Sequence, residues 1–217
     1  WVRHVPGLRT ARARICRLAC GRMMYHVKEI FHTLQGEGAR AGRASVFVRF
    51  SGCNLWSGLE RDRSLAICQF CDTEFVGTDG TGGGKFLHAE ELAQALWSHW
   101  PASAKGVPYA VCTGGEPALQ LDLELISALK TKGFEIAVET NGTVALPAGL
   151  DWICVSPKAG TQLSVRTGSE LKLVFPQSGA EPELFEHLEF ANFFLQPMDG
   201  LHLEANTRAA IEYCKTH

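Results

Sequence analysis

The sequence of 217 residues lacks long hydrophobic runs and has no excess of charge of either sign. No stretch approaches the roughly 20 apolar residues of a membrane-spanning helix, and the start lacks the continuous apolar segment of a secretory signal. A formal net charge of −2 offers no basic surface to nucleic acid and favours a small-molecule partner. We therefore expect a cytoplasmic protein with no membrane partner and no direct nucleic-acid partner.

Acidic residues are absent from residues 1–23, a stretch that contains six arginines. Pro6, Gly7 and scattered apolar residues interrupt it, so we interpret it as a non-native or disordered extension rather than an Arg-rich targeting peptide. Cys16 and Cys20 belong to this stretch, and we assign them no role. Residues 24–217 are long enough for one sizeable core, and we expect them to form a single domain.

From Tyr25 onward, short apolar runs alternate with longer amphipathic ones, which is typical of strands and helices in turn and predicts an α/β fold with a parallel sheet. The expected strands are 45–50, 109–112, 135–138, 152–155, 171–174 and 193–195. The expected helices are 88–99, 118–132, 182–188 and 204–215.

Polar clusters follow four of these strands. TGGEP comes after Cys112, ETNG after Val138, SPK after Val155 and QPMD after Leu195. Because parallel α/β folds bind ligands at the carboxyl ends of their strands, these clusters predict one shared ligand cavity.

Three of the eight cysteines have the spacing of metal ligands. Fourteen residues separate Cys53 from Cys68, and two separate Cys68 from Cys71. Without a secretion signal, such cysteines are better interpreted as reduced thiols or ligands than as disulfides. A cubane held by three cysteines leaves one iron open, whereas structural zinc requires a fourth ligand. His88 or His99 could supply one, although neither has finger or ribbon spacing, so zinc remains an alternative.

The TGGEP motif suits a ligand with an amino group. Its two glycines let the backbone approach a bound molecule closely, and the Glu116 carboxylate can accept from an α-amino group. Pro117 then opens the following helix. A tight turn with a solvated glutamate is the alternative explanation.

Cys53-Asn54-Leu55, the Cys68 to Cys71 pair and Gly114-Gly115-Glu116-Pro117 together resemble the radical S-adenosylmethionine superfamily. The first gap is longer than in the usual CxxxCxxC motif. One branch, the 7-carboxy-7-deazaguanine synthase family, is similar over this insertion and over the CDT that follows the last cysteine. The resemblance runs from about Tyr25 to Cys214. It implies a partial, open (βα)6-type TIM-like barrel of mainly parallel strands.

The resemblance also implies which residues bind the cofactors and the substrate. A 4Fe-4S cluster would bind Cys53, Cys68 and Cys71, and Mg2+ would bind Thr73, while no side chain acts as a catalytic group of its own. S-adenosylmethionine would contact Phe70, Cys71, Asp72, Gly115, Glu116, Ser156, Pro157, Lys158 and Gln196. The substrate would contact Leu34, Gln35, Gly36, Glu37, Arg49 and Thr113. Taken alone, the QGEG segment also fits a turn, CDT fits a helix cap, and Lys158 fits a solvated surface lysine.

The reaction implied is the conversion of 6-carboxy-5,6,7,8-tetrahydropterin to 7-carboxy-7-deazaguanine with loss of ammonia, a lyase step in queuosine biosynthesis. Hydrogen abstraction by a 5′-deoxyadenosyl radical would start it. The resemblance further implies an external, flavodoxin-like one-electron donor, a homodimer, and a chain that stops before a C-terminal substrate-binding tail. The alternatives are a radical enzyme that activates a partner protein at a glycyl residue and a zinc-bearing structural module.

Overall fold

The computed structural model describes residues 24–217, and the expected extension, with Cys16 and Cys20, lies outside the described residues. The described residues form one eight-stranded sheet with the order β3-β1-β2-β4-β5-β6-β7-β8. The strands are β1 (Tyr25–Leu34), β2 (Ala44–Phe50), β3 (Gly84–Phe86), β4 (Tyr109–Gly114), β5 (Glu135–Thr140), β6 (Trp152–Val155), β7 (Thr167–Phe175) and β8 (Glu189–Pro197).

The sheet is mostly parallel and is not closed. β1 pairs antiparallel with both β2 and β3, whereas β2, β4, β5, β6, β7 and β8 pair parallel in that order. β3 and β8 are the two edges. The expected open, mainly parallel α/β barrel is therefore confirmed, with an antiparallel addition at one edge.

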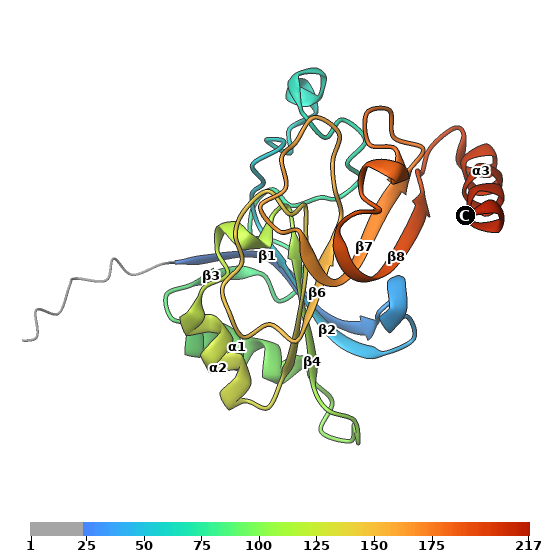
Figure 1. Ribbon diagram of the computed structural model, residues 1–217. Helices are drawn as coiled ribbons and strands as arrows, with labels where there is room; N and C mark the ends of the chain where they lie inside the picture. The colour runs from blue at the N-terminus through green and yellow to red at the C-terminus, as the bar shows by residue number, and fades with distance from the viewer. Residues whose placement is uncertain (1–23) are drawn as a thin grey trace, which may run out of the picture.

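Helices cover the outer face of the sheet at one end and its edge at the other (Figure 1). α1 (Ala89–His99) and α2 (Leu123–Thr131) lie together, and α3 (Leu203–Thr216) lies beside β8. Alternate residues of β2, β4 and β5 point to the first pair and form the main core with it. This core includes Val46, Val48, Phe50, Leu92, Leu96, Ala110, Cys112, Leu125, Leu129, Ile136 and Val138. No helix within residues 24–217 is long and apolar enough to cross a membrane.

The inner face is filled at the amino ends of the strands. The Arg43 guanidinium lies 3.8 Å from the centre of the Tyr109 ring, and that of Arg40 lies 4.2 Å from the Trp152 ring. Both arginines pair with the Glu135 carboxylate. Because these large side chains occupy the amino end, open space on the inner face is left toward the carboxyl ends.

Two expected helices differ from the structure. Residues 118–132 divide into a 3-10 turn at Pro117–Leu119 and α2, since Asp122 caps α2 by accepting from the Leu125 N–H at 2.8 Å. Residues 182–188 form only a 3-10 turn, Pro182–Leu184. The other 3-10 turns are Gly38–Arg40 and Glu60–Leu65.

β1 is absent from the expected strands because charged residues interrupt its apolar pattern. Lys28 lies within it and is buried. Its ammonium group donates to Glu74 at 2.7 Å, to Asp79 at 2.9 Å and to the Val76 carbonyl at 3.0 Å. A charge that is satisfied this fully by later residues can stand in a strand that a local pattern does not predict.

Candidate active site

A cavity of about 310 Å³ opens at the carboxyl ends of the parallel strands. Residues from all four polar clusters line it: Thr113, Gly114 and Gly115, then Glu139, Thr140 and Asn141, then Ser156 and Lys158, and finally Gln196, Pro197, Met198 and Asp199. The expectation of one shared cavity at this rim is confirmed.

Cys53, Cys68 and Cys71 all line this cavity, and none of the three forms a disulfide. The Cys68 thiol donates to the Cys71 sulfur, which lowers the pKa of Cys71 to about 6. The same contact, with burial, raises the pKa of Cys68. Burial also raises the pKa of Cys53, although the Leu55 N–H donates to its sulfur at 3.4 Å. Cys71 is therefore the thiol that ionises most readily.

The TGGEP turn packs directly on the backbone beside Cys53. A Cβ atom on Gly115 would lie 2.1 Å from the Gly52 carbonyl oxygen, and Gly114 has a φ of +143°. The Glu116 N–H donates to the Gly52 carbonyl at 2.9 Å. The two glycines thus allow a close approach of the β4 and β2 ends, which brings the motif to the first cysteine.

Glu116 itself does not line the cavity. Its side chain is fully buried and accepts from the Thr140 hydroxyl at 2.6 Å, the Asn141 N–H at 2.8 Å and the Ala118 N–H at 3.0 Å. Burial raises its pKa despite these three donors. The alternative of a solvated glutamate is wrong, and the contact with an amino group stays a prediction.

The expected S-adenosylmethionine residues, except Glu116 and the buried Pro157, line the cavity. Lys158 donates to the Ser156 carbonyl at 2.6 Å and to its hydroxyl at 2.8 Å. Burial lowers the pKa of Lys158. The lysine lies in the cavity wall, so the alternative of a solvated surface lysine is wrong.

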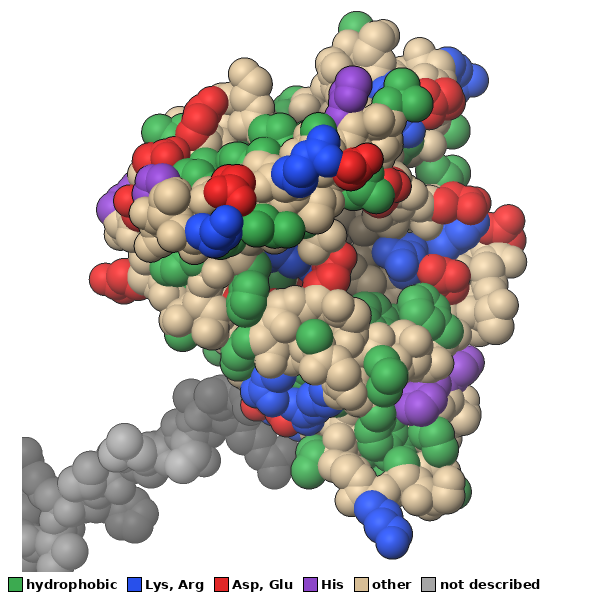
Figure 2. Space-filling model, turned by 90° about the vertical axis from the view of Figure 1, so that its right-hand side faces the viewer, with side chains coloured by type: hydrophobic (Ala, Val, Ile, Leu, Met, Phe, Trp, Pro, Cys, Tyr) green, Lys and Arg blue, Asp and Glu red, His purple; other side chains and the backbone are tan. Residues whose placement is uncertain are grey.

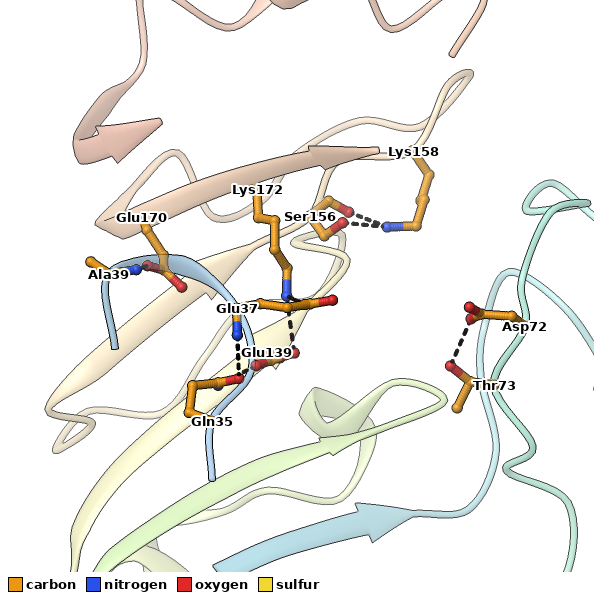
Figure 3. A network of polar contacts seen from close by, with 10 residues as sticks. All are labelled: Gln35, Glu37, Ala39, Asp72, Thr73, Glu139, Ser156, Lys158, Glu170 and Lys172. Atoms are coloured by element: carbon orange, nitrogen blue, oxygen red, sulfur yellow. Dashed lines mark hydrogen bonds and ion pairs between the residues drawn. The ribbon is translucent and has the colours of Figure 1, made fainter. Parts of the chain in front are cut away.

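A polar network lies beside Ser156 and Lys158 in the same cavity, and Asp72 and Thr73 lie across from it (Figure 3). The Lys172 ammonium group pairs with Glu37 and lies 3.4 Å from the Glu139 carboxylate. Gln35 is buried and donates its amide to Glu139 at 2.8 Å. Burial lowers the pKa of Lys172, but Glu139 and Glu37 outweigh it and raise that pKa above its ordinary value. Lys172 is therefore an ammonium ion throughout the neutral range.

Of the other expected substrate residues, some line the cavity and others do not. Thr113 lines the cavity, whereas Leu34 and Gly36 do not, and Leu34 is exposed. Arg49 donates to Glu29 at 2.8 Å and lines an adjoining cavity that it shares with Asp72 and Thr73. Asp72 and Thr73 lie in an irregular loop, so the helix-cap alternative for CDT is wrong.

Comparison with known proteins decides the family. No protein-family model matches the chain. A 7-carboxy-7-deazaguanine synthase from Caulobacter vibrioides is 60% identical over 195 residues, which are 90% of this chain and 92% of that protein. The synthase from Bradyrhizobium diazoefficiens is 63% identical over the same shares. The crystal structure of QueE from Escherichia coli matches with a TM-score of 0.62 and 26% identity, over 90% of this chain and 92% of that one.

The chain belongs to the 7-carboxy-7-deazaguanine synthase family. The resemblance seen in the three cysteines and the TGGEP motif is thereby confirmed, and the chain is an enzyme of the radical S-adenosylmethionine type. Such enzymes use a 4Fe-4S cluster and S-adenosylmethionine.

The residues of this synthase-family cavity fit such a cluster. Three soft thiols line one cavity, next to the apolar side chains of Leu55, Phe70 and Phe75. Within residues 24–217, no three His, Cys, Asp or Glu side chains are grouped to hold a single metal ion. Cluster ligands need not converge in that way, because each cysteine binds a different iron.

Several cavity residues of this synthase-family chain were not assigned from the sequence. Glu139, Asn141 and Asp199 lie in the polar clusters that predicted the cavity, but their individual roles were not predicted. Lys172 was not singled out at all. The available signal was a lysine inside an apolar run within an expected central strand, since such a charge needs buried partners.

Proposed function

We propose that the chain converts 6-carboxy-5,6,7,8-tetrahydropterin to 7-carboxy-7-deazaguanine with loss of ammonia. One observation carries the proposal: Cys53, Cys68 and Cys71 share a single cavity with Glu37, Glu139 and Lys172, and the buried Gln35 donates to Glu139. The sequence identity of about 60% to curated synthases supports the same reaction.

Cys53, Cys68 and Cys71 would hold the 4Fe-4S cluster, which supplies one electron for the cleavage of S-adenosylmethionine at the iron without a protein ligand. The chain binds and orients the reactants around it. Leu55, Phe70 and Phe75 keep water from this part of the cavity.

The wall formed by Gly115, Ser156, Lys158 and Gln196 would receive S-adenosylmethionine. Gly115 holds this wall close to Gly52 and Cys53, and the Lys158 ammonium can pair with the methionine carboxylate. Glu116 supports this wall by fixing the loop at Thr140 and Asn141.

The neighbouring part of the cavity, at Glu37, Glu139 and Lys172, would receive the pterin. An aminopyrimidinone edge presents N–H donors, which the Glu37 and Glu139 carboxylates can accept from, while the buried Gln35 fixes Glu139 by donating to it. Arg49 would bind the substrate carboxylate, since only its Nε is engaged by Glu29 among the contacts described and a guanidinium carries five donors.

Mg2+ at Thr73 is part of this proposal. The Thr73 hydroxyl donates to Asp72 at 3.4 Å, so two hard oxygen atoms lie together at the border of the main and adjoining cavities. Thr73→Ala should reduce turnover and its dependence on added Mg2+ while the iron content stays unchanged. A Thr73→Ala protein without iron would contradict this division of roles.

An external one-electron donor of the flavodoxin type also belongs to the proposal, because the cluster must be reduced before it can cleave S-adenosylmethionine. A homodimer is proposed on the family resemblance alone. Light scattering after gel filtration measures its mass.

The test is an anaerobic assay of the reconstituted protein with S-adenosylmethionine, dithionite and the pterin, read by mass spectrometry. We expect 7-carboxy-7-deazaguanine to form only when all components are present. Cleavage of S-adenosylmethionine without any pterin product would favour an enzyme that activates a glycyl residue. A colourless protein that binds zinc instead of iron would remove the proposal.

A further inference from the structure

The segment between Cys53 and Cys68 is fourteen residues long, where the usual motif of the superfamily has three. A longer loop loses more conformational entropy when its ends are brought together. In this structure the segment is folded back on itself. The Ile67 N–H donates to the Leu55 carbonyl at 3.0 Å, and the Ser57 hydroxyl donates to Asp62 at 2.8 Å.

Arg63 connects this segment to the cysteine pair. It lies in the 3-10 turn Glu60–Leu65, and its Nη1 donates to the Gln69 carbonyl at 2.8 Å and to the Cys71 carbonyl at 3.0 Å. These two carbonyls flank Phe70. The second and third cysteines are therefore tied to the inserted segment through one guanidinium group.

Arg63 is also fixed on its other sides. Its guanidinium lies 4.2 Å from the centre of the Trp56 ring, and Trp56 is buried and meets Phe75 edge to face at 5.7 Å. Its Nε lies 2.8 Å from both oxygens of Glu60. Trp56 follows Cys53 by three residues, so the stacking contact anchors Arg63 near the first cysteine.

We propose that Arg63 is a positioning residue that holds the Cys68–Cys71 loop at a fixed distance from Cys53. The segment between Cys53 and Cys68 then restrains the cysteine pair, and Arg63 compensates for the flexibility that this longer segment would introduce. This proposal rests on the proposed function, because it assumes that the three cysteines bind a cluster.

An arginine is required for this role. Its planar group stacks on Trp56 while its separate nitrogens reach two carbonyls and a carboxylate. Lysine keeps the charge but has a single nitrogen, so it cannot satisfy all of these partners. Arg61 offers a matched control. It lies on the same 3-10 turn, its side chain is 79% exposed, and its Nε lies a long 3.7 Å from the Asp62 carboxylate.

The experiment compares wild type, Arg63→Ala, Arg63→Lys and Arg61→Ala after anaerobic reconstitution. It measures bound iron per chain, the rate of iron loss to a chelator, and the electron paramagnetic resonance spectrum of the reduced cluster. We expect Arg63→Ala to lose iron about 10-fold faster or more, as for other residues that orient metal ligands. Arg63→Lys should lie between it and wild type, and Arg61→Ala should match wild type.

Equal iron loss in Arg63→Ala and Arg61→Ala would overturn the proposal. If Arg63→Ala does not fold, as judged by its thermal unfolding before reconstitution, the Arg63→Lys variant decides, and wild-type retention there overturns it. The proposed function fails separately, when the wild-type protein holds a cluster but makes no product.

Discussion

Lys172 shows how one side chain organises the cavity. It lies in β7 with its side chain 10% exposed, and it pairs with two carboxylates that would otherwise repel each other. Gln35 completes the set by its bond to Glu139. The network therefore holds two acceptors in place at the wall that we assign to the pterin.

Lys172→Met should leave Glu37 and Glu139 without their cation. We expect a loss of about 2 kcal/mol in the free energy of unfolding, the usual cost of a buried group left unsatisfied, measured by urea unfolding. We also expect weaker binding of a pterin analogue in fluorescence titration, because the two carboxylates then disfavour each other's ionised form. Lys172→Arg should retain most of the binding. Unchanged affinity in Lys172→Met would contradict this role.

Glu116 is a second residue of this kind: the TGGEP motif predicts a contact with the ligand, whereas in the structure its carboxylate binds the protein itself. Its carboxylate accepts three hydrogen bonds from donors on two segments. Glu116→Gln places an amide donor among these donors, and we expect it to lower the free energy of unfolding by about 1–3 kcal/mol. Calorimetry measures the effect. A variant with unaltered stability but weakened binding of S-adenosylmethionine would show that Glu116 acts as a direct ligand instead.

The sequence predicted the cysteines, Thr113, Ser156 and Lys158 as parts of one site because each stands in a local motif at a strand end. Lys172 could not be predicted in this way. Its partners Glu37 and Glu139 come from distant parts of the chain, and only the folded sheet brings the three together.

At the scale of elements, the junction of β2 and β4 positions the site. The Gly115 N–H donates to the Phe50 carbonyl at 3.2 Å, and a Cβ atom on Gly115 would collide with the Gly52 carbonyl. The strand ends can therefore meet only with glycine at this position.

Gly115→Ala should push the β4 end away from Cys53. We expect the variant to bind less iron after reconstitution and to have a lower melting temperature than wild type, since backbone must move to admit the methyl group. Gly106→Ala is the matched control, because nothing lies within 4 Å of the added Cβ atom there. Wild-type iron content in Gly115→Ala would show that this close approach is not needed.

The elements were predicted where local pattern and burial agree, as in β2, β4, β5 and β6, each of which contains buried apolar residues. β1, the short edge strand β3 and the turn at Pro182–Leu184 were not. β1 depends on the distant partners of Lys28, and the segment after β7 follows the packing of Leu188 and Phe190 rather than a helical period.

At the scale of the whole molecule, charges of both signs alternate on the face that carries a recess. Figure 2 shows acidic and basic side chains next to each other around a recess on one face. This distribution agrees with the small net charge and with a small-molecule substrate. The amino end of the sheet is closed instead by Arg40, Arg43 and Glu135.

The closed amino end should make stability depend on pH in the acid range. Arg43 holds the pKa of Glu135 below its ordinary value. The stabilisation is complete above the ordinary pKa of a glutamate and is lost as the pH falls through the lower value of the folded state. We expect Glu135→Gln to cost ~1 kcal/mol at pH 7 and progressively less as the pH falls through the acid range, measured by urea unfolding. A cost independent of pH would contradict this origin.

The central claim is that three thiolates of one cavity hold a cluster and leave one iron free for S-adenosylmethionine. Mössbauer spectroscopy of protein reconstituted with ⁵⁷Fe tests it most directly. We predict that adding S-adenosylmethionine changes the signal of roughly one quarter of the iron, the single iron without a cysteine. A spectrum in which no iron responds, or a protein that takes up no iron, would contradict the account.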